Sequence, residues 1–240
     1  MQPEEIHVRF RFQYLYYKYI FYLFTKSYSI ILLINIFIYL YSFTLGQTSA
    51  NKLVKVKEII PDIEIELKYS TTDNFTKEIL YPTSTCYLAF GTIENLKLVQ
   101  DSLRNLQFHN GINYTDGLGL KIWDGYRPRS VQYRMWDIVP DPRYVADPNI
   151  GSSHNRGGAV DLTIIDFSTK KELDMPTVFD FFGVEAHHEY MEHPLHVIAN
   201  RKLLKNLMTS VAGFSSHAEE WWHYKYPPSE DFPLFDLELE

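Results

Sequence analysis

Residues 152–161 read Ser-Ser-His-Asn-Arg-Gly-Gly-Ala-Val-Asp, a turn-forming stretch that leads into an apolar run. The two glycines let the backbone turn closely beneath a bound group, so this loop can deliver His154 into a site. Residues 159–165 are mostly apolar and predict a strand that carries Asp161. An aspartate framed by apolar neighbours is costly to bury unless it is paired or bound to a cation. A histidine and an aspartate at this spacing are weak evidence alone; the full string favours a metal site.

A second short stretch, residues 219–223, reads Glu-Glu-Trp-Trp-His. Catalytic zinc usually takes three nitrogen or oxygen ligands from the protein, and a carboxylate that stays off the metal can accept a proton from water. Glu220 and His223 would lie on opposite faces of a regular strand, so their convergence requires a bend or the end of an element. The alternative is a rim of exposed acids beside a tryptophan core, which leaves the histidine unexplained.

Arg127 lies in a third segment, Asp-Gly-Tyr-Arg-Pro at residues 124–128, which follows a predicted strand. The glycine and proline fix a turn there. Two interpretations are equally open: Arg127 pairs with an acid at the surface, or its guanidinium stabilises the oxyanion formed during amide hydrolysis.

The other reactive side chains favour simpler roles. The single cysteine, Cys86, excludes an intramolecular disulfide and a cysteine-ligated zinc site, and its apolar neighbours favour a buried residue over a nucleophile. Five further histidines are expected at the surface or as partners that orient a metal ligand: His187, His188, His193, His196 and His217.

Composition bounds the class of protein. The chain has 240 residues, of which 45% are hydrophobic, enough for one domain with a sizeable core. Its formal net charge is -7, and no basic cluster follows residue 50. These features argue against nucleic acid as a partner.

The first fifty residues differ from the rest of the chain. Basic residues precede an apolar run at residues 30–45, and small residues follow it near residue 50. We interpret residues 1–50 as a signal peptide or, alternatively, an N-terminal membrane anchor, and residues 51–240 as the functional domain. Either interpretation predicts export to a periplasmic or other extracytoplasmic location, with membrane anchoring in the second case.

Short strands and helices alternate without a regular βαβ period, which predicts an α+β fold. Strands are expected in residues 54–67, 118–123, 159–165 and 221–226, and helices in 93–106, 129–138 and 194–211. Residues 139–153 are expected to form a loop, and the acidic tail from residue 227 to lie on the surface.

Six segments together resemble the D-alanyl-D-alanine dipeptidases of the vancomycin-resistance type, zinc peptidases related to D,D-carboxypeptidases and to the Hedgehog domain. The matching segments are residues 67–75, 86–88, 123–128, 152–163, 175–182 and 220–223. Their order and number make the resemblance specific. It implies a compact single domain with a central antiparallel sheet flanked by helices.

The resemblance also implies roles for individual residues. One zinc ion per subunit would be bound by His154, Asp161 and His223. Glu220 would be the catalytic base and then acid, and Arg127 would stabilise the transition state. The substrate would be held by Asp180 at its ammonium group and by Ser152 near its carboxylate.

The expected activity is therefore hydrolysis of the dipeptide D-Ala-D-Ala by a zinc metallopeptidase. A D,D-carboxypeptidase with a more open cleft, trimming longer peptidoglycan peptides, is one alternative. A zinc-stabilised binding module without catalysis is another, although it would need neither Glu220 nor Arg127. The N-terminal segment departs from the best-known resistance enzyme, which acts in the cytoplasm, and it favours scavenging of wall-derived dipeptide over resistance.

Overall fold

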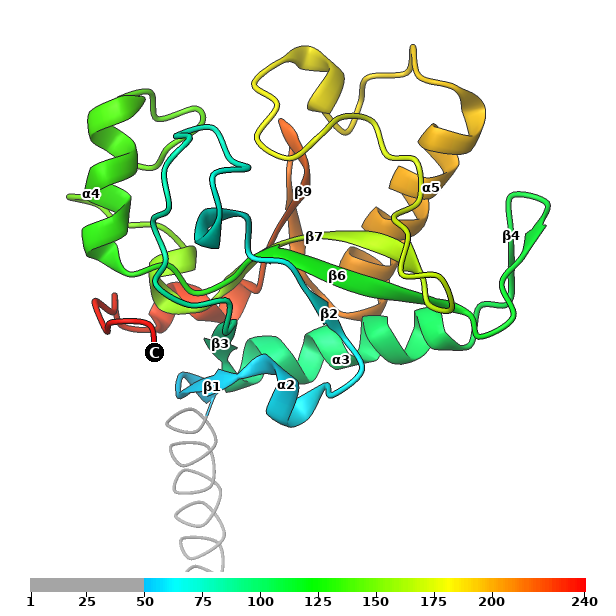
Figure 1. Ribbon diagram of the computed structural model, residues 1–240, viewed down its shortest axis with the longest axis horizontal. Coiled ribbons are helices and arrows are strands. Elements are labelled where there is room, and N and C mark those ends of the chain that lie inside the picture. The colour runs from blue at the N-terminus through cyan, green and yellow to red at the C-terminus, as the bar shows by residue number, and fades with distance from the viewer. Residues whose placement is uncertain (1–49) are drawn as a thin grey trace, which may run out of the picture. The chain divides into compact units, whose positions relative to one another are not determined.

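A five-stranded mixed sheet forms the centre of the computed structural model, which describes residues 50–240 (Figure 1). The strand order is β2-β6-β7-β9-β8. The strands are β2 (Glu64–Ile65), β6 (Leu118–Asp124), β7 (Ala159–Asp166), β8 (Ser215–His217) and β9 (Glu220–Lys225). The predicted leader, residues 1–50, lies outside the described residues except for residue 50.

The expectation of an antiparallel sheet is correct for four strands and wrong for the fifth. β6, β7, β9 and β8 pair antiparallel, whereas the edge strand β2 runs parallel to β6. Parallel neighbours need a crossover connection. Helix α3 (Phe90–Arg104) lies in the segment between β2 and β6 and packs against β6, so the chain returns to the sheet in the same direction.

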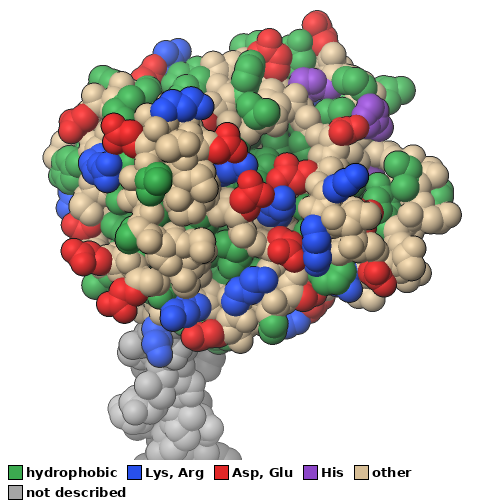
Figure 2. Space-filling model, viewed as in Figure 1, with side chains coloured by type: hydrophobic (Ala, Val, Ile, Leu, Met, Phe, Trp, Pro, Cys, Tyr) green, Lys and Arg blue, Asp and Glu red, His purple; other side chains and the backbone are tan. Residues whose placement is uncertain are grey.

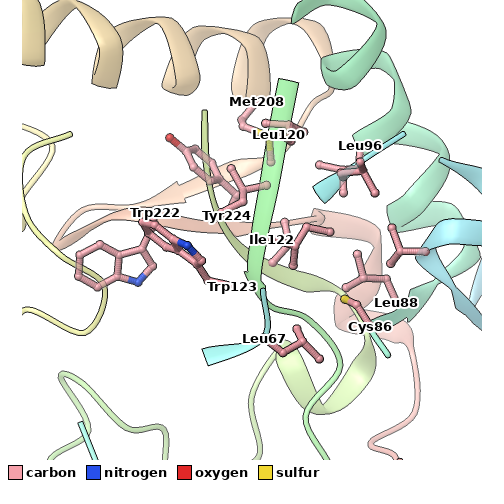
Figure 3. Packing of buried hydrophobic residues seen from close by; sticks show 14 of the residues in the cluster. Leu67, Cys86, Leu88, Leu96, Leu120, Ile122, Trp123, Met208, Trp222 and Tyr224 are labelled. Atoms are coloured by element: carbon pink, nitrogen blue, oxygen red, sulfur yellow. The ribbon is translucent and has the colours of Figure 1, made fainter. Parts of the chain in front are cut away.

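Helix α3 covers one face of the sheet because its apolar residues recur at helical spacing. Its fully buried side chains include Ile93, Leu96 and Val99. Figure 3 shows Leu96 opposite Leu120 and Ile122 of β6, while Trp123 projects to the other side of the strand. This alternation gives the sheet one face toward the helical core and one face toward the loops that form the site.

The predicted helices agree closely with the structure. Helix α4 spans Arg129–Ile138, and helix α5 spans Leu195–Asn206 and continues as a π-helical turn over Leu207–Val211. The helical segment ends before Gly213, whose backbone adopts a left-handed φ of 70°. Residues 139–153 form the expected loop.

The strand predicted over residues 54–67 is broken into shorter elements. β1 (Leu53–Lys55) pairs with β3 (Tyr87–Ala89), and one helical turn, α2 (Val56–Ile59), separates β1 from β2. Pro61, which lacks a backbone N–H, begins the turn that interrupts the segment. A small hairpin of β4 (Phe108–His109) and β5 (Ile112–Asn113) completes the strands of the described chain.

The acidic tail is bound to the domain more closely than expected. Phe232 is 3% exposed and Leu239 is 7% exposed. The Phe235 N–H donates to the carbonyl of Asn155, and the Tyr126 hydroxyl is hydrogen-bonded to Leu237. The tail therefore packs against the residues next to Arg127 and His154. It can do so because apolar residues alternate with its acids and are available for burial.

Surface charge is mixed in sign. Figure 2 shows acidic and basic side chains interspersed over the visible face. Cys86 is buried, as expected from its neighbours. Within residues 50–240, the longest apolar helices fall short of what crossing a membrane requires.

Candidate active site

Strand pairing brings two of the three proposed metal ligands together. Asp161 of β7 lies directly opposite His223 of β9, so both side chains project from the same face of the sheet. His154 comes from the 3-10 turn His154–Arg156, which ends at Gly157 in the left-handed conformation that glycine favours. One ligand atom from each of His154, Asp161 and His223 lies within 4.8 Å of the other two.

The distances among these atoms suit a shared cation. His223 Nδ1 lies 2.8 Å from Asp161 Oδ1, and His154 Nε2 lies 3.4 Å from Asp161 Oδ2. His154 Nε2 and His223 Nδ1 are 3.2 Å apart. Burial alone would raise the pKa of Asp161, but the two imidazoles hold it below its ordinary value. A deprotonated carboxylate facing two ring nitrogens is the donor set that catalytic zinc takes, so the residues fit this metal.

The orientation of His154 supports the same conclusion. Its Nδ1 lies 2.8 Å from the carbonyl of Gly125, which makes Nδ1 the donor and leaves the Nε2 lone pair facing Asp161 and His223. Metal-binding histidines usually donate their second N–H in this way, because the bond fixes both tautomer and ring orientation.

Glu220 opens strand β9 and faces the three ligands without joining them. Its Oε2 lies 3.9 Å from His223 Nδ1. The pairing of β8 with β9 shifts register between Ser216 and His217, beside Glu220, and this irregularity is the bend that convergence of Glu220 with His223 requires. Burial raises the pKa of Glu220 to about 7, and nearby Asp161 adds to the effect. A carboxyl group that titrates near neutrality can both accept and return a proton.

Arg127 is 8% exposed and points into the site, so the structure does not support a pairing at the surface. Its Nε and Nη2 donate to Asp124 Oδ2 at 3.1 and 2.6 Å, and its Nη1 donates to Gln132 Oε1 at 2.9 Å. Burial alone would lower the pKa of Arg127, but Asp124 raises it, so the guanidinium stays charged. Three bonds leave two N–H groups of the guanidinium for a substrate.

Asp124 was not singled out from the sequence, although it lies three residues before Arg127. It is fully buried, and its Oδ1 accepts hydrogen bonds from the Tyr81 hydroxyl at 2.6 Å and the Gly125 N–H at 2.9 Å. Its Oδ2 also lies 3.6 Å from His154 Nδ1. Asp124 therefore positions the arginine and lies beside a proposed ligand.

Asp180 borders the site, and its own backbone position is strained. Its φ is 58°, in the left-handed region that non-glycine residues rarely adopt. The carboxylate accepts hydrogen bonds from the Tyr69 hydroxyl at 3.1 Å and the Phe75 N–H at 3.3 Å. Burial raises its pKa to about 7, with a further contribution from Asp161. A buried acid with two neutral donors is ready to accept a cationic group.

All seven residues proposed from the sequence border one cavity of about 290 Å³, called the site cavity below. They are Arg127, Ser152, His154, Asp161, Asp180, Glu220 and His223. Tyr69 and Tyr144 also line the site cavity and were not proposed from the sequence. The volume is at the low end for ligand pockets, which suits a small substrate.

Of the remaining histidines, only His217 reaches the site cavity among the described residues. Its ring meets His223 edge-on with centroids 5.7 Å apart, so it packs against a proposed ligand as the sequence analysis allowed. His188 is buried outside the site cavity, and burial lowers its pKa to about 3.

Comparison with known proteins places the chain among peptidases. A family model described as D-ala-D-ala dipeptidase matches residues 49–233. A D-alanyl-D-alanine dipeptidase of Escherichia coli is 36% identical over 187 residues, which cover 78% of this chain and 91% of that protein. Proteins of the same description from Enterococcus faecalis and Streptomyces coelicolor are 32% and 34% identical, covering 73% and 77% of this chain and 91% and 96% of their own lengths.

Proposed function

The chain belongs to the D-Ala-D-Ala dipeptidase family, and from this membership we propose that it hydrolyses D-Ala-D-Ala to two molecules of D-alanine with one zinc ion. The observation that carries the proposal is the convergence of three metal-ligating groups, a free carboxyl group, a buried guanidinium and a second acid on one small cavity.

His154, Asp161 and His223 would hold the zinc ion. When bound, zinc polarises the scissile carbonyl and lowers the pKa of the attacking water. The Gly125 carbonyl keeps the His154 ring oriented for this task. The pairing of β7 with β9 keeps Asp161 and His223 side by side.

Glu220 performs the proton transfers. Its carboxylate accepts a proton from the attacking water and then donates it to the nitrogen of the departing D-alanine. Both steps suit a group whose pKa is about 7, since neither protonation state is strongly disfavoured near neutral pH. Arg127 directs its two remaining N–H groups at the developing oxyanion, and Asp124 and Gln132 hold the guanidinium in place.

The two ends of the substrate are held by different groups. The Asp180 carboxylate pairs with the free ammonium of the dipeptide, and the Ser152 hydroxyl donates to its terminal carboxylate. A longer peptide has an uncharged amide where the ammonium would be, so Asp180 would lack a cationic partner. The small volume of the site cavity and the buried Asp180 thus favour a dipeptidase over a D,D-carboxypeptidase.

The non-catalytic alternative has less support. A site that only stabilises the fold has no use for a carboxyl group facing the ligands or for a buried arginine beside them. Glu220 and Arg127 both border the site cavity, as hydrolysis requires.

The activity is tested with purified full-length protein and one equivalent of zinc. D-Ala-D-Ala, L-Ala-L-Ala and a muramyl pentapeptide are each supplied, and released alanine is measured. We expect D-alanine from the first substrate alone. Release from the pentapeptide at a comparable rate would favour the carboxypeptidase, and no release from any substrate at full zinc occupancy would favour the binding module.

We also propose that the protein is exported and acts on dipeptide released from the cell wall. The support is the basic and then apolar composition of residues 1–50. Cell fractionation with mass spectrometry of the mature N-terminus tests this proposal. A cytoplasmic protein that retains Met1 would contradict it.

A further inference from the structure

A second cavity adjoins the site cavity. It has a volume of about 800 Å³ and is called the outer cavity here. Leu173, Met175 and Phe182 line it, together with Lys68 and Asp73. Phe75 and Asp180 border both cavities, so the two spaces are separated by a wall about one side chain thick.

Three aromatic rings from three separate loops build this wall. Tyr144 stacks on Phe182 with ring centroids 4.5 Å apart and an interplanar angle of 26°. Phe75 meets Phe182 at 5.4 Å and 59°. We call Phe75, Tyr144 and Phe182 the aromatic wall. In Figure 1, the loop after β2 that carries Phe75 runs between α4 and the loop that precedes α5.

The two rings of the stacked pair border different cavities. Tyr144 lines the site cavity, and Phe182 lines the outer cavity. All three residues are half-buried. Aromatic contacts of this kind stabilise by about 0.5–1.5 kcal/mol beyond the area that they bury. The wall is therefore a packed structure whose removal would join the two cavities.

Asp180 fixes which end of a substrate meets the wall. Its carboxylate is hydrogen-bonded to the Phe75 N–H, and it lies two residues before Phe182 in the chain. If Asp180 pairs with the ammonium of the dipeptide, the amino end of the substrate lies against the aromatic wall. A residue added before that amino group would then lie toward the wall, with the outer cavity on its far side.

We propose that the aromatic wall sets the length of the substrate by ending the site cavity at the amino group of a dipeptide. The outer cavity is then the space that the upstream residues of an N-acylated peptide would occupy once the wall is opened. This inference rests on the proposed dipeptidase function and assigns the limit on substrate length to these three residues.

Two barriers to a longer substrate can be separated. The aromatic wall excludes upstream residues by shape, whereas Asp180 disfavours the uncharged amide because an amide offers its carboxylate no positive charge. Opening the wall removes only the first barrier. Replacing Asp180 removes only the second.

The test compares kcat/KM for D-Ala-D-Ala with kcat/KM for an N-acetylated tripeptide that ends in D-Ala-D-Ala. Phe182→Ala and Tyr144→Ala should each raise the ratio of tripeptide to dipeptide activity roughly tenfold or more. Tyr144→Phe keeps the stacked ring and should leave the ratio near that of the wild type. Phe181→Ala enlarges the outer cavity without touching the stack, so it should also leave the ratio unchanged.

Combining variants sharpens the result. Asp180→Asn alone should not allow cleavage of the tripeptide, because the aromatic wall is intact in this variant. Added to Phe182→Ala, it should raise the ratio further, since an amide side chain can pair with the acylated nitrogen or its carbonyl. Should Phe182→Ala fail to fold, the same ratio is measured on Phe182→Leu, which keeps an apolar side chain but lacks the flat ring that stacks on Tyr144.

Unchanged ratios in folded, zinc-loaded Phe182→Ala and Tyr144→Ala proteins would overturn the inference. The failure of the proposed function gives a different result. A wild-type protein that does not cleave D-Ala-D-Ala contradicts the dipeptidase function itself, whereas a wild type that cleaves it and wall variants that gain nothing contradict only the role of the wall.

Discussion

The site is built from two halves of different construction. One half is borne by the sheet: Asp161 and His223 lie opposite each other in paired strands, and Glu220 opens one of those strands. The other half is borne by loops: Arg127, Asp180 and the aromatic wall come from segments without regular pairing. The sheet half carries two of the three proposed zinc ligands and the proposed base, and the loop half adds His154, Arg127 and the groups that would hold the substrate. Variants should therefore separate chemistry from selection of substrate.

The largest effect is expected in the sheet half, from His223→Ala. Removing one of three ligands should lower bound zinc well below one equivalent and abolish activity, because the remaining two groups cannot hold the ion tightly. Metal analysis by mass spectrometry after dialysis measures the loss. His196→Ala is the matched control, since His196 is exposed and pairs with Asp174 at 3.2 Å away from the site. Full zinc content in His223→Ala would remove His223 from the ligand set.

Glu220→Ala should be the next most damaging change and should leave zinc in place. Loss of a general base typically lowers kcat by about 10²–10⁴-fold. Steady-state kinetics and metal analysis on the same sample distinguish it from a ligand variant. Glu219→Ala removes the neighbouring acid and should change neither quantity. A Glu220→Ala protein that keeps full activity would show that another group takes the proton.

Asp124→Asn tests the ion pair that connects the two halves, because Asp124 is the last residue of β6 and pairs with the loop residue Arg127. Breaking a buried ion pair on one side leaves an uncompensated charge and typically costs about 3–5 kcal/mol of stability. We expect a lower Tm and a lower kcat with zinc retained. The exposed pair of Asp101 and Lys97 on α3 lies away from the site cavity, so Asp101→Asn is the control and should leave Tm and kcat nearly unchanged. Equal effects of the two changes would mean that burial of the Asp124 pair is unimportant.

The contrast between the halves also explains what sequence alone can predict. The helix at residues 93–106 follows from local periodicity and the strand bearing Asp161 from its apolar run, and the residues within each motif lie close together along the chain. The parallel pairing of β2 could not be predicted, because a two-residue strand has no pattern and its partner lies beyond a crossover helix.

The loop half was predicted less completely for a similar reason. Asp124 accepts a hydrogen bond from Tyr81, and Tyr144 stacks on Phe182; both contacts join residues about forty positions apart through tertiary packing. No spacing rule indicates such pairs. The resemblance supplied Asp180 and Ser152, but the place of Asp180 beside the aromatic wall appears only in three dimensions.

The smallest effect is expected from the pH dependence of substrate binding in the loop half. Burial raises the pKa of Asp180 to about 7, so in the free protein this carboxyl group is largely protonated below pH 7 and ionised above it. Only the ionised form attracts an ammonium group, and KM for D-Ala-D-Ala should therefore fall as pH rises through about 7. Asp180→Asn should raise KM and remove that dependence while zinc content stays constant.

The same ionisation acts on stability with the opposite sign. A carboxyl group whose pKa is higher in the folded state binds its proton more tightly there, so its contribution to stability is complete below the ordinary pKa of 3.8 and is lost as pH rises to about 7. Comparing the pH dependence of Tm for wild type and Asp180→Asn isolates this contribution. If the two Tm curves run parallel between pH 4 and pH 7, the pKa of Asp180 is not raised in the folded protein. The placement of its side chain by the strained loop, and not its ionisation, would then account for substrate binding.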